Sequence, residues 1–194
     1  MSAQSISISP STHQDNGRIP LLSSPVLGML IFVVMEMMFF AALISSFSII
    51  KAGALFWPPP QQPRLPVEVT AFNTLILIAS AIFLFLANRA FAKPELREKA
   101  QKMLTLCFLG GSLFVLIQGY EWVQLIGYGL TMTSSTYGSF FYLIIGSHAL
   151  HVISALIVLL FCLIRFKKKT VSPAFFHASQ VFWYFVVGVW PILY

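Results

Sequence analysis

Charged residues are scarce in this chain of 194 residues, where Asp, Glu, Lys and Arg together make up 9% of the sequence. A typical soluble domain has about 25% charged residues. Hydrophobic residues make up 58%, and the mean hydropathy is +0.84. Such an apolar composition excludes an ordinary soluble domain and predicts that any function lies within or beside a membrane.

Cysteine is scarce, and the sequence shows no recognisable cleavable export signal. The two cysteines, Cys107 and Cys162, both lie in apolar stretches, and no CxxC pair occurs. We therefore expect buried packing thiols rather than a disulfide framework or a thiolate metal site. No basic region precedes a short apolar core with a cleavage site, so we expect the first apolar stretch to be retained.

Long apolar runs dominate the sequence. Each is long enough to cross a hydrocarbon core of about 30 Å, which needs roughly 20 residues as a helix. Because lipid offers no hydrogen-bond partners, each run must satisfy its backbone groups internally as a helix. The prediction is an all-α bundle of five transmembrane helices, with spans at about 26–50, 67–92, 103–126, 137–164 and 174–194.

Little of the chain lies outside these spans, so the sequence predicts one domain. Residues 1–25 are polar, rich in Ser and broken by prolines, and we expect a flexible tail that leaves residues 26–194 as the membrane domain. The segment from Trp57 to Pro66 has five prolines and is expected to be stiff and extended. The segment from Lys93 to Lys99 is expected to begin the third helix before it enters lipid.

Basic residues are concentrated in the connections after the second and the fourth run. With the N-terminus in the cytoplasm, ten of the twelve Lys and Arg residues lie on the inner side. The positive-inside rule therefore predicts an N-terminus in the cytoplasm and a C-terminus outside, in the periplasm. The net charge of +6 reflects these loops and does not indicate nucleic-acid binding.

A few ionisable and polar residues interrupt the apolar runs. An ionisable group near the bilayer centre costs about 2.5–3.5 kcal/mol on insertion scales, so it has to face protein, water or another polar group. At about 1.5 Å per residue, Glu36 and His151 both come near the midplane, and we expect Glu36 to meet the face shared by His148 and His151. Glu121 is expected nearer the outer surface and partly wet. The candidate intramembrane cluster, structural or lipid-binding, is Glu36, Gln118, Glu121, His148 and His151.

Each of these groups has a structural interpretation beside a chemical one. Glu36 is interpreted either as a protonated carboxyl bonded to a hydroxyl or as a functional acid. The pair His148 and His151 either links helices or supplies metal ligands, but zinc or iron needs a further ligand at that depth, and Glu36 is the only obvious one. Gln118 and Glu121 form either a structural hydrogen-bond pair or a proton relay. No catalytic, cofactor-binding or metal-ligating residue is assigned.

Five groups of residues follow one another in a recognisable order along residues 26–194. They are Glu36-Met37-Met38-Phe39-Phe40; Trp57-Pro58-Pro59 with Leu65-Pro66-Val67-Glu68 and Asn73-Thr74; Gln118-Gly119-Tyr120-Glu121; Tyr137-Gly138-Ser139-Phe140-Phe141; and Gly146-Ser147-His148-Ala149-Leu150-His151-Val152. In this order they resemble subunit III of the haem–copper oxidases, which include cytochrome c and quinol oxidases. Two positions depart from the family pattern, because Gln180 stands where an acid is frequent and Ala149 where Gly is frequent.

The resemblance implies a short, five-helix form of that family, because many members have seven spans and this chain matches the last five. It implies a multi-pass, non-catalytic subunit of a respiratory terminal oxidase in the bacterial inner membrane. Such a subunit stabilises the catalytic subunit, supports proton uptake and proton translocation, and binds phospholipid. The implied partners are the catalytic subunit I, which would hold haem and copper, and other oxidase subunits. His177, in the last span near the inner surface, is a candidate for proton uptake.

The residue inventory agrees with a subunit that has no redox centre of its own. Two haems and a copper need about half a dozen membrane histidines, whereas this chain has four His in total and His13 lies in the tail. Three other classes stay open at this point: an accessory subunit of a nitric oxide reductase, a small proton-coupled transporter and a membrane desaturase or hydroxylase. A transporter would suit midplane Glu and His, but no inverted repeat or broken helix pair occurs. A desaturase would need many more clustered histidines.

Overall fold

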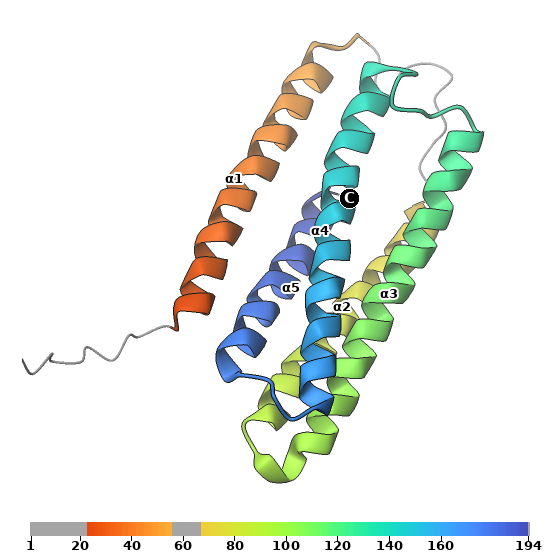
Figure 1. Ribbon diagram of the computed structural model, residues 1–194. Coiled ribbons are helices and arrows are strands. Elements are labelled where there is room, and N and C mark those ends of the chain that lie inside the picture. Colours follow the sequence, from red (N-terminus) through yellow and green to blue (C-terminus); the bar gives the residue numbers. More distant parts are fainter. Residues whose placement is uncertain (1–22, 56–66, 194) are drawn as a thin grey trace, which may run out of the picture.

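The computed structural model describes residues 23–55 and 67–193, which form a bundle of long helices (Figure 1). Successive helices run in opposite directions, so the α2–α3 and α4–α5 turns lie at the same end of the bundle. Five helices in these ranges are long and apolar enough to cross a membrane. They are α1 (Ser24–Gly53), α2 (Val67–Phe91), α3 (Arg97–Gly127), α4 (Thr136–Lys167) and α5 (Pro173–Leu193), with a 3₁₀ turn η1 (Pro94–Leu96) before α3.

Local sequence signals set several helix boundaries. α1 begins after Ser23 with a proline in its first turn, where the missing N–H has no intrahelical partner to lose. Ser135 caps α4, because its side-chain oxygen accepts a hydrogen bond of 3.0 Å from the backbone N–H of Gly138. After α4, Lys169 adopts a left-handed backbone conformation with φ of 58°. These signals determine where α1 and α4 begin and where the chain turns after α4.

Burial differs sharply between the helices. Within an apolar stretch of 18 residues in each helix, 61% of the residues are buried in α5 but only 11% in α1. α5 packs against α1, α2 and α4, while α2 and α3 form the most closely packed pair. α5 is therefore the central helix, and α1 is a peripheral helix whose outer face is open to lipid or to a partner.

The core depends on an indole that fits against a glycine. Trp183 of α5 is fully buried, and a Cβ added to Gly111 of α3 would lie 2.3 Å from its Cη2 atom. The Trp183 Nε1–H donates a hydrogen bond of 3.2 Å to the Ser80 hydroxyl of α2. One side chain of α5 thus holds α2 and α3, and only glycine at position 111 leaves room for it.

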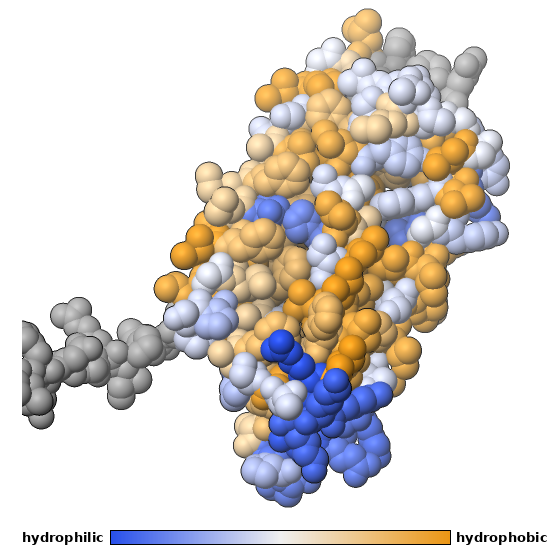
Figure 2. Space-filling view, in the orientation of Figure 1, coloured by the Kyte–Doolittle hydropathy of each residue, from blue (hydrophilic) through white to orange (hydrophobic). Residues whose placement is uncertain are grey.

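The basic residues gather where α2 turns into α3 and α4 into α5 (Figure 2). We call this the basic end. Three of its guanidinium groups lie over aromatic rings: Arg89 over Phe85 at 5.5 Å, Arg97 over Phe166 at 5.2 Å and Arg165 over Phe175 at 5.1 Å. Its exposed basic residues are Arg89, Lys93, Arg97, Lys99, Lys102, Arg165, Lys167, Lys168 and Lys169.

The all-α, five-helix fold expected from the sequence is confirmed. α1 begins at Ser24, two residues before the expected span, and α3 begins at Arg97, six residues before it. The chain therefore enters the third helix before its apolar run, as the sequence predicts. Most of the expected tail (residues 1–22) and the segment from Trp57 to Pro66 lie outside the described residues, so their character and the division into tail and membrane domain stay predictions.

Candidate functional site

A carboxyl–imidazole pair joins α1 to α4 in the middle of the bundle. His151 Nε2 and Glu36 Oε2 lie 2.9 Å apart, and their side chains are only 13% and 21% exposed. On the other side of the ring, His151 Nδ1 lies 2.7 Å from the Ser147 carbonyl oxygen. A carbonyl oxygen only accepts hydrogen bonds, so Nδ1 carries a proton and donates it there.

This geometry determines the net charge of the pair. With Nδ1 protonated, the contact between Nε2 and the carboxyl needs one further proton. That proton gives either an imidazolium beside a carboxylate or a neutral imidazole that accepts from a carboxylic acid. Both forms have no net charge, and a neutral pair costs far less in apolar surroundings than a single buried ion. The pairing explains how α1 carries an acid in the middle of an apolar helix.

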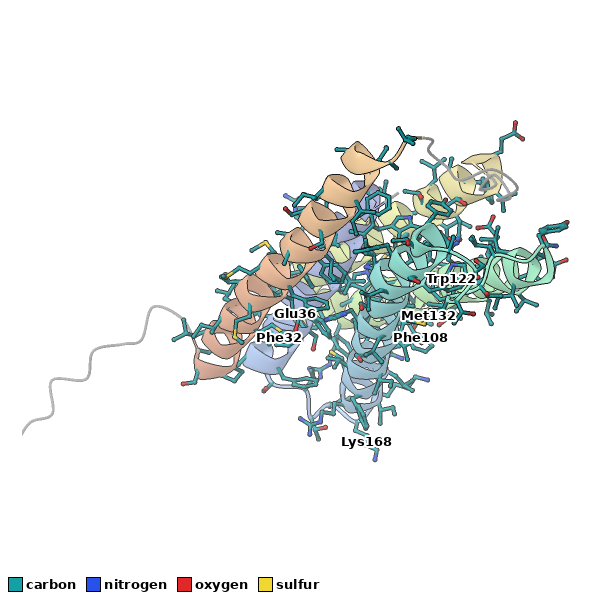
Figure 3. All side chains as sticks on the ribbon, turned by 90° about the horizontal axis from the view of Figure 1, so that it is seen from above. Phe32, Glu36, Phe108, Trp122, Met132 and Lys168 are labelled. Carbon is teal, nitrogen blue, oxygen red and sulfur yellow. The ribbon has the colours of Figure 1, made fainter. Side chains whose placement is uncertain are left out.

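Aromatic rings surround this pair. Phe40, one turn after Glu36, is 3% exposed, and its ring meets the His151 ring edge-on at 5.4 Å. Figure 3 shows Glu36 and Phe32 on the side of α1 that faces the other helices. Phe32 packs edge-on against Phe182 of α5 at 5.7 Å. The pair therefore supplies a directional contact at an interface that is largely apolar.

A second polar group lies between α2 and α3, toward the end of the bundle opposite the basic end. Glu121 Oε2 accepts hydrogen bonds from the Thr70 hydroxyl at 3.1 Å and from Gln118 Nε2 at 2.9 Å. Asn73 Nδ2 donates to Gln118 Oε1 at 3.3 Å and to the Phe114 carbonyl at 3.1 Å. Four side chains from two helices thus form one hydrogen-bond chain, which we call the α2–α3 polar group.

His148 takes part in neither group. Its ring stacks on Trp190 of α5, with ring centroids 5.2 Å apart and 27° between the planes, and neither ring nitrogen has a hydrogen-bond partner. Residues three apart on an α-helix point about 60° apart, so His151 faces α1 while His148 turns toward α5. The expected contact with Glu36 is therefore made by His151 and not by His148.

The other candidate residues lie apart from the Glu36–His151 pair. Glu121 is 5% exposed, which corrects the expectation that its side chain would be partly exposed to water. The reason is that α2 packs over this face of α3 and covers the carboxyl. His177 is exposed at the basic end, and its ring lies 6.0 Å from that of Phe176. Gln180, which replaces the family's frequent acid, donates a hydrogen bond of 3.1 Å to Asn88 of α2.

The α2 half of the α2–α3 polar group was not predicted from the sequence. Thr70, Asn73, Leu77 and Ser80 recur at intervals of three and four residues, which places them on one helical face, and all are buried. Three polar side chains along a buried stripe signal a polar helix interface. Asn73 entered the sequence reasoning only as part of a family motif, although its burial at 0% exposure makes it a central member of the group.

These groups offer hydrogen bonds and a shared proton. Among residues 23–55 and 67–193, no three His, Cys, Asp or Glu side chains gather closely enough to hold a metal ion. Cys107 and Cys162 are both buried free thiols. The arrangement that is present can hold a proton between Glu36 and His151 and can fix the helices relative to one another.

Comparison with known proteins identifies the family. A family model described as cytochrome c oxidase subunit III matches residues 8–194. A probable cytochrome c oxidase subunit 3 from Nocardia farcinica is 35% identical over 166 residues, which cover 84% of this chain and 81% of that protein. The probable cytochrome c oxidase subunit 3 of Mycobacterium leprae is 37% identical over 173 residues, 86% of this chain and 83% of that protein. Cytochrome c oxidase subunit 3 of Papio hamadryas is 34% identical over 196 residues, 96% of this chain and 74% of that protein. The chain, a multi-pass bundle of membrane helices, therefore belongs to the cytochrome c oxidase subunit III family.

Proposed function

We propose that this chain is the accessory subunit III of a respiratory haem–copper oxidase, attached to a catalytic subunit that holds the haem and copper. The observation that carries the proposal is the family match, which extends over residues 8–194 and so over all five helices. The polar groups inside the bundle support it, because their hydrogen bonds join α1 to α4 and α2 to α3, as a structural subunit requires.

The role that fits this architecture is to stabilise the catalytic subunit and to sustain proton uptake over many turnovers. α1 presents large exposed side chains, among them Ile31, Met35 and Met38, to its surroundings. An apolar face this wide on a membrane helix suits a neighbouring subunit or phospholipid acyl chains. We assign α1 to that contact, with the Glu36–His151 pair holding the helix against α4 behind it.

Proton uptake would take place at the basic end. Lysine and arginine stay protonated at neutral pH and do not relay protons, whereas an imidazole does. His177 is exposed among these basic residues and is the side chain that we assign to this role. In this proposal the basic end faces the cytoplasm of a bacterial cell, in agreement with the positive-inside rule and with the bacterial relatives.

A deletion experiment tests the role of the subunit. The oxidase is purified with and without this chain, and oxygen consumption is followed together with proton uptake until activity stops. We expect similar initial rates but several-fold fewer turnovers before inactivation when the chain is absent. Re-addition of the purified chain is the control and should restore the lifetime. Equal lifetimes and equal proton uptake in the two preparations would contradict the proposed role.

A further inference from the structure

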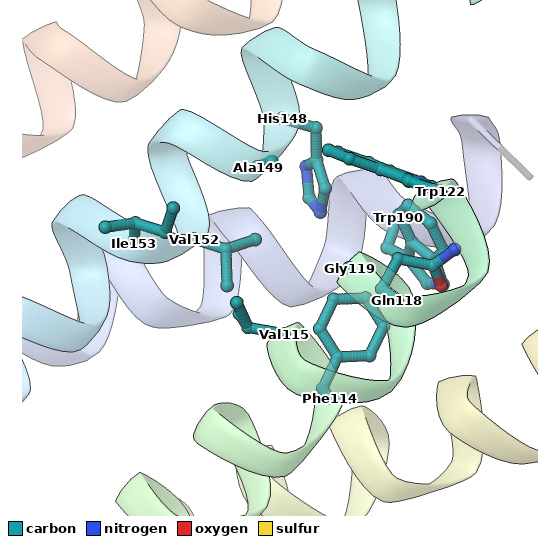
Figure 4. A pocket seen from close by; sticks show the side chains of 10 residues that line it. All are labelled: Phe114, Val115, Gln118, Gly119, Trp122, His148, Ala149, Val152, Ile153 and Trp190. Atoms are coloured by element: carbon teal, nitrogen blue, oxygen red, sulfur yellow. The ribbon is translucent and has the colours of Figure 1, made fainter. Parts of the chain in front are cut away.

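A cavity of about 190 Å³ lies between α3, α4 and α5 (Figure 4). Its floor is made of buried side chains from all three helices, among them Phe114, Val152 and Trp190. Its rim belongs to α3 and α4, where Ile153 is 44% exposed. The cavity is therefore a recess that opens outward on the side of the bundle, and we call it the α3–α4–α5 recess.

The wall of this recess is apolar although polar residues contribute to it. Gln118, Trp122 and His148 line it, but the unpaired nitrogen atoms of Trp122 and His148 each expose less than 1 Å². Figure 4 shows the rings of Trp122, Trp190 and Phe114 around one side of the space. A polar ligand would lose its hydrogen bonds in such surroundings, whereas an apolar cavity of about 150 Å³ stays dry and takes up small apolar molecules. The ligand that fits the recess is therefore hydrocarbon-like.

Small residues stand on both helices at the mouth of the recess. Gly119 of α3 and Ala149 of α4 line it, and both are partly exposed. A Cβ added to Gly119 would meet no atom within 4 Å, so the space beside this residue is open. The α3 side of the mouth therefore leaves room for a narrow ligand that enters from outside the bundle.

The depth of the recess matches the ends of phospholipid acyl chains. α4 has 32 residues, and its midpoint falls between His151 and Val152. Ala149 and Ile153, which line the recess, lie within one turn of that midpoint. The hydrocarbon core of a bilayer is about 30 Å thick, so the headgroups lie at its two surfaces and the acyl chain ends meet near its middle. A chain end reaches the mouth of the recess at this depth, whereas a headgroup does not.

We propose that the α3–α4–α5 recess binds the terminal segment of a phospholipid acyl chain from the surrounding bilayer. The inserted segment packs against Val152 and Trp190 and supplies the dispersion contacts that an empty space would deny to these side chains. The described lining residues come from α3, α4 and α5, so the site is separate from the exposed face of α1. It requires only that the bundle spans a bilayer and does not depend on the role proposed for the subunit.

Solid-state NMR of the full chain in phospholipid bilayers tests this proposal. The chain is deuterated and carries ¹³C-labelled tryptophan rings, while the lipids keep their protons, so transfer from lipid and transfer from water are told apart by proton shift. Trp190 and Trp183 form a matched pair, because they are 1% and 0% exposed and only the first of the two lines the recess. We expect transfer from the acyl methyl protons to Trp190 to be at least three-fold greater than to Trp183. Equal transfer to the two rings, or transfer to Trp190 from water in place of lipid, would overturn the proposal.

A variant that blocks the mouth gives a second test. Gly119→Leu places a side chain in the open space, and we expect it to reduce transfer from the acyl methyl protons to Trp190 at least two-fold. Gly146→Leu is the control, because a Cβ at Gly146 also meets nothing within 4 Å but this residue does not line the recess, so transfer should stay unchanged. Unchanged transfer in Gly119→Leu would mean that lipid reaches Trp190 by another route and would contradict the site. If that variant does not fold, Ala149→Leu blocks the mouth from α4, with the same result expected.

Discussion

The two carboxyl groups inside this bundle, Glu36 and Glu121, are accommodated in different ways. Glu36 lies on the peripheral helix α1 and has a single titratable partner, the His151 imidazole. Glu121 lies within the closely packed α2–α3 pair and accepts hydrogen bonds from two neutral donors, Thr70 and Gln118. An acid paired with an imidazole can exchange a proton with its partner, whereas an acid held by neutral donors has no such exchange.

The two carboxyls therefore differ in role: Glu36 forms a pair in which a proton can shift, and Glu121 joins two helices through hydrogen bonds. The proton shared by Glu36 and His151 can lie on either side chain without changing the net charge of the pair, which is zero in both forms. The α2–α3 polar group loses two buried hydrogen bonds when Glu121 loses its acceptor oxygens, because Thr70 and Gln118 both donate to Glu121 Oε2. Substitutions in the α2–α3–α5 core should therefore reduce stability most, and substitutions at the peripheral helix or the exposed end should reduce it less.

The largest effect is expected for Gly111→Ala in the α2–α3–α5 core. The new Cβ would lie 2.3 Å from Trp183 Cη2, so the indole or the helix must move. Overpacking of this kind costs about 3 kcal/mol in the free energy of unfolding at the upper end of its usual range. Reversible unfolding in mixed micelles with increasing SDS measures the loss. Gly146→Ala on α4 is the matched control, since a Cβ there meets nothing within 4 Å, and it should leave stability nearly unchanged.

The next largest effect is expected for Glu121→Leu. The substitution removes the acceptor of two buried hydrogen bonds, from the Thr70 hydroxyl and from Gln118 Nε2, at a cost of about 2 kcal/mol. Glu121→Gln keeps a carbonyl oxygen in the same place and should cost less than half as much. The same SDS titration checks both variants. Equal losses for Leu and Gln would show that the hydrogen bonds at this carboxyl do not determine the stability of the interface.

A smaller effect is expected for Glu36→Leu. The substitution removes one interhelical hydrogen bond, at a cost of about 1 kcal/mol for such a bond within a membrane protein. The loss is limited because the pair is partly exposed and α1 is the least buried helix. A loss greater than that of Glu121→Leu would reverse the proposed difference between the two carboxyls. Glu36→Gln is the control, because its amide N–H can donate to His151 Nε2, which keeps a hydrogen bond and removes the exchangeable proton.

The smallest effect on stability is expected for His177→Ala. The side chain is exposed at the basic end, and surface substitutions of this kind change the free energy of unfolding by about 0.5 kcal/mol or less. The same variant in the assembled oxidase should slow proton uptake during turnover if His177 has the role that we propose. A large loss of stability would instead assign His177 to the packing of α5.

The fold could be predicted from the sequence because a bilayer sets both the length and the composition of a crossing helix. The runs around Leu30, Ile78 and Leu159 meet that requirement whatever their partners are, so their number and approximate limits follow from composition alone. Helix rotation does not follow in the same way. His148 and His151 are close enough in sequence to suggest one shared face. Their side chains nevertheless point about 60° apart, so His151 contacts Glu36 of α1 and His148 contacts Trp190 of α5.

The α2 half of the α2–α3 polar group and the contact between Gly111 and Trp183 were not predictable, because both depend on which helix faces which. The sequence marks Asn73 and Ser80 as members of one stripe, but it does not say that Gln118 or Trp183 lies opposite them. Such contacts are fixed only when all five helices are packed together, since each helix satisfies its own backbone and can rotate about its axis.

The most direct test of the central claim is the haem and metal content of the chain with and without its partners. A tag on this chain is used to extract the complex in mild detergent, and absorption spectra and metal analysis are recorded before and after the subunits are separated. The account predicts that a haem-bearing catalytic subunit copurifies in a fixed ratio and that the separated chain retains neither iron nor copper. Stoichiometric iron or copper on the separated chain, or extraction without any haem protein, would contradict it.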